Sequence, residues 1–224
     1  MFSKEPKVCQ MGVLGLRALT NSVLEQDASP EQIYALVTGM IQEDLLYLLA
    51  LNLYRLAFES RKDAQVIFSY VLRFRPPTAS PKSEPLALSY VINSRPEVLV
   101  ELCNGYDHKE SATAAGTVLR EVLKSDAAAA IILYHDPTSE GAAKGLSGIQ
   151  PEVRQSGQGV FWKFFAWIDQ GSFEVGADAF TTFRVSLYNM CVVEDCTYDI
   201  TGAPYQTQAD CGTIPLHEFR PLFR

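Results

Sequence analysis

Helical periodicity runs through most of this 224-residue chain, and strand-like alternation is nearly absent before residue 185. In residues 30–54, apolar side chains recur at steps of three and four positions, which places them on one stripe of an amphipathic helix. Such a stripe has to be buried against another helix, because no single helix can cover its own apolar face. We therefore predict an all-α fold.

Three helical segments resemble weak copies of one another. They begin at Ala64, Ala115 and Ala179, and each carries a large apolar residue four positions later and another after four more. A small residue lets a helix approach its neighbour closely, and the apolar residues fill the space between repeats. The pattern favours an armadillo-like helical-repeat solenoid, a right-handed superhelix of helix pairs or triplets. A compact helical bundle stays open as the alternative.

The sequence also contains signals for where helices start and break. Ser29, Pro30 and Gln32 form a capping box with proline in the first turn, so a helix should begin there. Gly39 weakens this helix, and we expect a break near it. Asp126 is expected to cap the alanine-rich helix that follows it. Further helices are predicted at residues 45–56, 62–74, 85–92, 96–103, 112–124, 126–134, 160–168 and 173–183.

We divide the chain into three parts. Residues 1–29 form an N-terminal helix or extension, and residues 30–184 hold the helical repeats. Residues 185–224 form a tail with little helical periodicity that we expect to be poorly ordered. Two irregular segments interrupt the repeats. They are a proline-rich loop at 75–85 and a glycine-rich segment at 136–159, which we expect to be a flexible surface insertion.

Charge and hydropathy exclude several classes of function. The net charge of −7, without a cluster of Lys and Arg, argues against nucleic-acid binding. The longest apolar stretch, 45–58, is too short to cross a membrane and is interrupted by Asn52 and Arg55. The opening residues lack an apolar signal core, and five cysteines are an odd number. We therefore expect reduced thiols and a cytoplasmic location.

The sequence offers no convincing catalytic or metal-binding group. His108 stands in a polar helix start, His135 follows a helix C-terminus that favours positive charge, and His217 lies in the tail. The sequence has no Gly-x-Ser-x-Gly, Walker or His-Glu-x-x-His motif. Cys191, Cys196, Cys211 and His217 do not match a tight zinc pattern. We expect no enzyme activity, catalytic residue, metal, cofactor or small-molecule substrate.

Several motifs, in order along residues 30–184, resemble one known family. They lie at residues 58–63, 66–72, 99–106, 118–124, 161–165 and 173–183. These segments are similar to the family of the conidiophore development protein hymA, also called the mouse-protein-twenty-five or calcium-binding-protein-thirty-nine family. The long loops at 75–85 and 136–159 resemble its fungal branch.

The resemblance implies an armadillo-like rod without a catalytic site. Members of this family bind pseudokinases and germinal-centre (sterile-twenty-like) protein kinases and hold them in an active conformation, and in fungi they act in polarised growth, cell separation and conidiation. The expected partners are therefore such kinases, with no nucleic acid and no membrane insertion. The sequence has no Asp-x-Asp-x-Asn-Gly loop, so we expect no calcium site of that kind.

The chain also departs from the family. Family members continue beyond residue 184 with further repeats, and these hold the pocket for a Trp-Glu-Phe tail of the pseudokinase, so the partner-binding residues here are unknown. Val185-Ser186 corresponds to a translated splice donor, and we hypothesise that the tail is intron read-through. Two alternatives stay open, namely an armadillo-like adaptor with non-kinase cargo and a truncated gene product lacking the activating half.

Two groups of side chains are candidate binding residues. In the aromatic segment 160–168, four residues share one helical face, and we expect them to fill the core between repeats rather than bind a peptide: Phe161, Phe164, Phe165 and Ile168. Trp162 points elsewhere and is expected to be exposed. Arg61 and Lys62 fit a helix-entry loop with solvated charge, with contact to an acidic kinase surface as the alternative.

Overall fold

A computed structural model describes residues 15, 21, 29–77, 79–80, 83–138, 145–149, 156–169 and 172–193. These residues contain nine α-helices and three short 3₁₀ helices, and none of them lies in a strand. Apart from residues 15 and 21, the expected N-terminal extension up to residue 28 lies outside the described residues. The expected tail at 185–224 was placed too early, because residues 185–193 continue helix α10, and the rest of it, from residue 194, lies outside the described residues.

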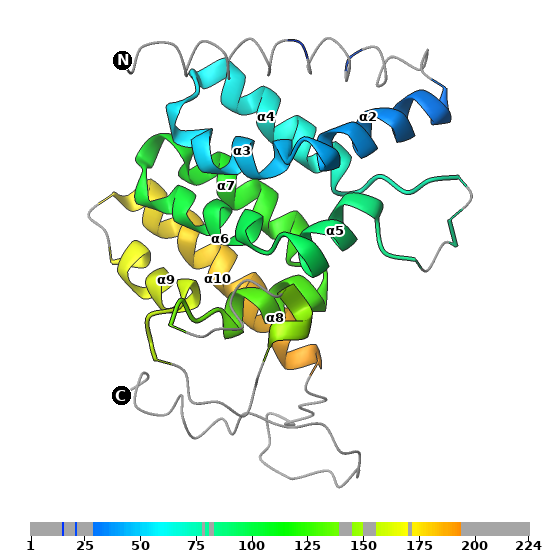
Figure 1. Ribbon diagram of the computed structural model, residues 1–224. Helices are drawn as coiled ribbons and strands as arrows, with labels where there is room; N and C mark the ends of the chain where they lie inside the picture. The colour runs from blue at the N-terminus through cyan, green and yellow to red at the C-terminus, as the bar shows by residue number, and fades with distance from the viewer. Residues whose placement is uncertain are drawn as a thin grey trace, which may run out of the picture.

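The helices form three consecutive triplets, which Figure 1 shows one below the other. The triplets are α2 (Pro30–Gln42), α3 (Leu45–Asn52) and α4 (Phe58–Val71); α5 (Leu86–Ser94), α6 (Glu97–Asn104) and α7 (Lys109–Val122); and α8 (Asp126–Tyr134), α9 (Val160–Ile168) and α10 (Phe173–Val193). Corresponding helices of successive triplets pack side by side, most closely the third helices α4, α7 and α10. The predicted all-α helical-repeat fold is confirmed.

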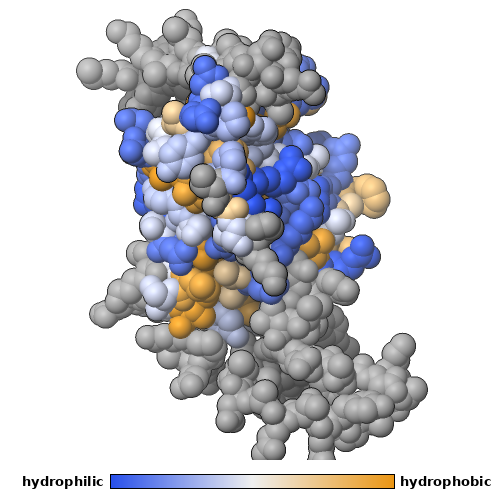
Figure 2. Space-filling model, turned by 90° about the vertical axis from the view of Figure 1, so that its right-hand side faces the viewer, coloured by the Kyte–Doolittle hydropathy of each residue, from blue (hydrophilic) through white to orange (hydrophobic). Residues whose placement is uncertain are grey.

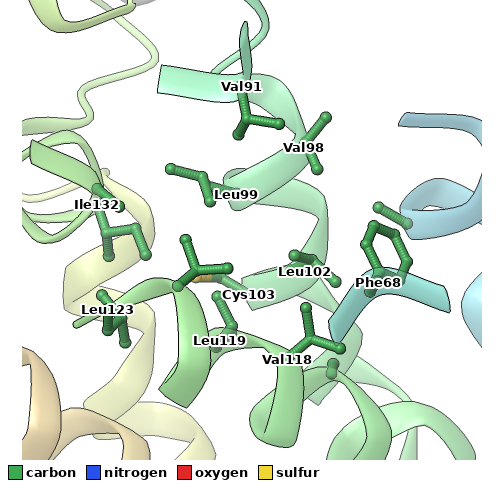
Figure 3. Packing of buried hydrophobic residues seen from close by; sticks show 14 of the residues in the cluster. Phe68, Val91, Val98, Leu99, Leu102, Cys103, Val118, Leu119, Leu123 and Ile132 are labelled. Carbon is green, nitrogen blue, oxygen red and sulfur yellow. The ribbon is translucent and has the colours of Figure 1, made fainter. Parts of the chain in front are cut away.

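The three segments predicted to be copies occupy equivalent places at the centre of this stack. Ala64, Ala115 and Ala179 are fully buried, one on each third helix. The large residues four positions later are at most 7% exposed: Phe68, Leu119 and Phe183. Figure 3 shows how side chains of α4 to α8 meet in one continuous core. Burying each such large side chain contributes roughly 1.5–3 kcal/mol to the free energy of folding. Because these side chains lie between triplets, the triplets stabilise one another.

Gly116 sets the distance between α7 and α10. A Cβ atom at this position would overlap the Asp178 carboxylate and the Tyr106 hydroxyl. Gly39 in α2 differs, because a Cβ atom there would meet nothing within 4 Å. The second triplet therefore needs glycine at residue 116 for close packing, whereas the first helix does not need glycine at residue 39.

The start of α2 is as predicted. Ser29 Oγ accepts a hydrogen bond from the backbone N–H of Gln32 at 3.3 Å, and Gln32 Oε1 accepts one from the Ser29 N–H at 2.9 Å. The predicted cap of α8 is wrong by one residue. Ser125 is the N-cap, and Asp126 begins the helix, where its charge complements the helix dipole.

The predicted break near Gly39 is also misplaced, because α2 continues to Gln42 and the chain turns at Asp44. Asp44 has a left-handed backbone with φ of 51°. Its carboxylate accepts hydrogen bonds from Arg95, with Arg95 Nη2 at 2.7 Å from Oδ2. Asp is one of the residues that adopt this backbone at low cost, and a partner in the next triplet holds it there.

The described parts of the 136–159 segment are attached to the stack. Asp136 is 9% exposed, and its carboxylate accepts hydrogen bonds from the Thr138 hydroxyl at 2.6 Å and from the N–H groups of Ser156 and Thr138 at 2.7 and 2.9 Å. These hydrogen bonds lower the pKa of Asp136. The 3₁₀ helix η3 (Gly145–Gly148) packs on α5 and α8.

His135 joins the end of α8 to the start of α9. Its Nδ1 accepts a hydrogen bond from the backbone N–H of Val160 at 3.3 Å. Burial lowers the pKa of His135. The expectation that this helix end favours a positive charge on His135 is therefore corrected, because the accepting nitrogen must be unprotonated.

In the described residues no single helix is long and apolar enough to cross a membrane. The α2 helix and the segment Leu45–Arg55 reach the required composition only when taken together, and they are bent by 66° at the break between them.

Replacing Gly116 with alanine should lower the free energy of unfolding by about 2 kcal/mol, because the methyl group must displace Asp178 or Tyr106. Urea unfolding followed by circular dichroism measures this. Gly39→Ala is the matched control and should raise stability by about 0.5–1 kcal/mol. Equal stability of the two variants would contradict the close approach at Gly116.

Stability should fall as the pH drops below about 6.5, in part through His135. The pKa of His135 is lower in the folded chain than in the unfolded one, so unfolding takes up a proton in this range and acid favours it. His135→Asn keeps a neutral acceptor near the Val160 N–H and should lose less stability between pH 7.5 and 5.5. Urea midpoints at both pH values test this, and the idea fails if the two proteins lose the same amount.

Candidate functional site

The described side chains do not suggest a catalytic or metal centre. Among the described residues there is no group of three or more His, Cys, Asp or Glu side chains that could hold a metal ion. His108 stacks on Tyr54, with ring centroids 3.9 Å apart, and His135 bonds the backbone of α9. The side chains of the cysteine set considered for zinc, and His217, lie outside the described part of the chain.

The outward side of α4, α7 and α10, called here the third-helix face, carries opposite charges at its two ends. Each third helix has one exposed acid at its second position, and these acids are Glu59, Glu110 and Glu174. Exposed bases lie toward the C-terminal side of these helices: Arg73, Lys124 and Arg184. Acids in the first turn complement the helix dipole. Arg73 and Lys124 lie just past the ends of α4 and α7, and Arg184 lies within α10. The acidic end also holds two exposed lysines, because Lys62 pairs with Glu59 and Lys109 pairs with Glu174.

Between these two groups most of the exposed residues are uncharged, and Asp178 and Arg120 are there only partly exposed and paired with each other. The exposed residues of the middle band are Val66, Thr113, Ala177, Phe180 and Thr181. Val66 and Phe180 are 49% and 51% exposed, on the first and third triplets. The third-helix face therefore consists of an acidic, a neutral and a basic band. Figure 2 shows a side of the stack where hydrophilic residues are interrupted by a group of hydrophobic ones low on the described surface.

A buried polar network under this face fixes α10 against α7. The Tyr106 hydroxyl donates to Asp178 Oδ2 at 2.6 Å, and Arg120 Nη1 donates to the same oxygen at 2.9 Å. Thr182 Oγ1 accepts a second bond from Arg120 at 2.9 Å. Tyr106 is fully buried, and burial raises the pKa of its phenol, so the hydroxyl keeps its proton. The network joins the second and third triplets.

This network was not predicted from the sequence, although the sequence holds one signal for it. In two of the three copies an aspartate stands directly before the small residue, as Asp63-Ala64 and Asp178-Ala179. Asp63 is also buried, at 7% exposure. An acid beside the most buried alanine of a repeat indicates a polar group held between helices, because a buried carboxylate needs partners.

The aromatic side chains of α9 pack largely as predicted. Phe161, Phe164 and Trp167 are buried in the core, and Phe165 packs against it. Trp162 differs from the prediction, because it is only partly exposed and packs against Phe161 and Phe165 at centroid distances of 5.6 and 6.1 Å. This segment therefore belongs to the core between repeats.

Arg61 and Lys62 have different surroundings. Arg61 Nη1 donates to the carbonyl oxygens of Leu56 and Tyr54 at 2.6 and 3.5 Å, so it clamps the turn before α4 rather than carrying solvated charge. Lys62 is exposed and lies 3.5 Å from Glu59 and 4.2 Å from the Phe58 ring centroid. Of the two, only Lys62 is available to a partner.

Comparisons with known proteins agree with this architecture. The family model described as Mo25-like matches residues 3–194, which include most of the expected N-terminal extension and the first residues of the expected tail. The chain is 52% identical over 170 residues to the conidiophore development protein hymA of Emericella nidulans, covering 75% of this chain and 44% of that protein.

Alignments with more distant relatives cover similar shares of this chain and of the relative. The Mo25-like protein of Schizosaccharomyces pombe is 28% identical over 174 residues, covering 78% of this chain and 44% of that protein. The calcium-binding protein 39-like protein of Homo sapiens is 27% identical over 160 residues, covering 71% and 39%. The chain thus spans less than half the length of each of these relatives.

Asp178→Ala should lower the free energy of unfolding by about 2 kcal/mol, because Tyr106 and Arg120 lose their shared acceptor in a partly buried site. Glu174→Ala is the matched control on the same helix. Glu174 Oε2 lies 3.9 Å from Lys109 Nζ, and the side chains of Lys109 and Glu174 are 68% and 78% exposed. Losing such an exposed ion pair should change the free energy of unfolding by less than about 0.5 kcal/mol. Denaturant unfolding distinguishes the two. An equally small effect of Asp178→Ala would contradict a stabilising role for this network.

Proposed function

The chain belongs to the Mo25-like family, and from this premise we propose that it is a non-catalytic cytoplasmic scaffold that binds germinal-centre protein kinases or pseudokinases. The observation that carries the proposal is the banded third-helix face on a stack joined by buried contacts. The name of hymA, a conidiophore development protein, supports a role in conidiation, and we extend the proposal to polarised growth and cell separation from the family resemblance.

Binding alone is enough for such a scaffold to change a kinase. A rigid surface that binds the active conformation more tightly than the inactive one shifts the kinase toward activity, and each 1.4 kcal/mol of difference is about tenfold in population. The third-helix face suits this role because its charges are held in fixed register. Its bands favour a partner whose own charges run in the opposite order.

The size of the face sets an expectation for affinity. A helix of 14 residues such as α4 is about 21 Å long, and packed helices lie about 8–10 Å apart. Three such helices offer on the order of 500 Å², compared with about 800 Å² per partner in a standard stable complex. We therefore expect micromolar binding through this face alone.

Arg73→Glu combined with Lys124→Glu should weaken binding to the catalytic domain of a germinal-centre kinase by about tenfold, because both changes reverse the basic band. Calorimetric titration measures the affinity, and a kinase assay with the chain added measures activation. The control is Gln42→Glu with Asn93→Glu, which adds negative charge at exposed positions on the first helices α2 and α5.

The outcomes separate the candidate functions. If the control pair weakens kinase binding by the same factor, the third-helix face is not the binding surface. Binding without activation would leave a scaffold and remove the activating role. Co-precipitation that recovers transport or cytoskeletal proteins and no kinase would favour the adaptor with non-kinase cargo.

A further inference from the structure

A cleft lies at the edge of the stack where second helices turn into third helices. It encloses about 270 Å³ between the first and second triplets. The C-terminal ends of α3 and α6 form its sides, together with the 3₁₀ turns η1 (Leu53–Arg55) and η2 (Gly105–Asp107) that follow them. Its polar lining residues are Asn52, Tyr54, Arg55, Glu101, Asn104, Asp107, His108, Ser111 and Lys163.

Contacts within the chain hold the cleft open. The rings of Tyr54 and His108 stack across the two triplets with an interplanar angle of 12°. Ser111 Oγ donates to the carbonyl oxygen of Gly105 at 2.7 Å, which fixes the start of α7 against η2. The walls are thus preformed, and a ligand entering the cleft would not have to order them.

Nearly every charged group that lines the cleft already has a polar partner. Arg55 donates to Tyr54 Oη at 2.7 Å and to Asn52 Oδ1 at 3.3 Å. Lys163 donates to Asn104 Oδ1 at 3.0 Å. The other two charged groups of the lining are the carboxylates of Asp107 and Glu101.

The two carboxylates differ in their polar contacts. Asp107 Oδ1 accepts a hydrogen bond from Trp167 Nε1 at 2.7 Å, and Oδ2 lies 3.9 Å from Lys163 Nζ. Glu101 as a residue is of intermediate exposure, and its carboxylate has no hydrogen bond or ion pair with any described residue. What the cleft lacks is therefore a cationic donor for Glu101.

Two bases also line the cleft, but Arg55 and Lys163 donate to Tyr54, Asn52 and Asn104 and not to Glu101. Helix ends add negative charge beside Glu101. The C-terminal ends of α3 and α6 carry partial negative charge, and both meet here. The same edge of the stack carries the acidic band of the third-helix face. Within it, Glu110 is exposed and has no ion pair with any described residue.

We propose that this cleft receives an arginine side chain from a protein partner, with the guanidinium paired to Glu101. A carboxylate with two free oxygens matches the two parallel N–H bonds of a guanidinium. A volume of about 270 Å³ suits one long side chain rather than a larger ligand. The inference rests on the proposed scaffold function only in that a protein supplies the arginine.

N-acetyl-arginine amide is the probe, added to the ¹⁵N-labelled chain and followed by amide chemical shifts. We expect shifts concentrated in residues 50–55 and 101–111. The neutral isostere N-acetyl-citrulline amide should bind about tenfold more weakly, and Glu101→Gln should weaken arginine binding by about tenfold. Glu121→Gln is the control, because Glu121 pairs with Lys124 and does not line the cleft.

Three results would overturn the assignment: no localised shifts with millimolar probe, equal binding of the citrulline analogue, or unchanged binding by Glu101→Gln. Glu101→Gln is isosteric, and unchanged shifts outside the cleft confirm that it folds. The test is independent of the kinase experiment, which alters the basic band at the other end of the third-helix face. Either proposal can fail while the other stands.

Discussion

The Asp178 carboxylate determines how the second and third triplets fit together. It accepts bonds from Tyr106 and Arg120, which reach it from the second triplet, in space that Gly116 leaves open. Apolar packing alone is not directional, so it tolerates sliding of one helix along another. A shared acceptor within the interface selects one position, and the register of the charged bands follows from it.

Local features of the fold were predictable from the sequence, and those that depend on distant partners were not. The capping box at Ser29 and the spacing around Ala64, Ala115 and Ala179 involve residues within one helix, so periodicity and cap chemistry were sufficient. The turn at Asp44 was misplaced because its backbone is held by Arg95, a residue of the next triplet.

The candidate site was less predictable than the fold. Acids and bases on single helices are visible in the sequence, but a band exists only once three helices are aligned. The same limit applies to Arg61, whose role as a clamp depends on the path of the chain around Leu56. It applies to the cleft as well, since Glu101 stands out only when the partners of its neighbours are known. Surface chemistry of this kind follows from packing.

The pairing of Asp44 with Arg95 has a consequence for how such repeats evolve. The bend between α2 and α3 belongs to the first triplet, yet the guanidinium that holds it lies at the end of α5. A duplicated or transplanted first triplet would carry the left-handed aspartate without its counter-ion. The units of this stack are therefore not interchangeable modules, and recombination that preserves function must move Asp44 and Arg95 together.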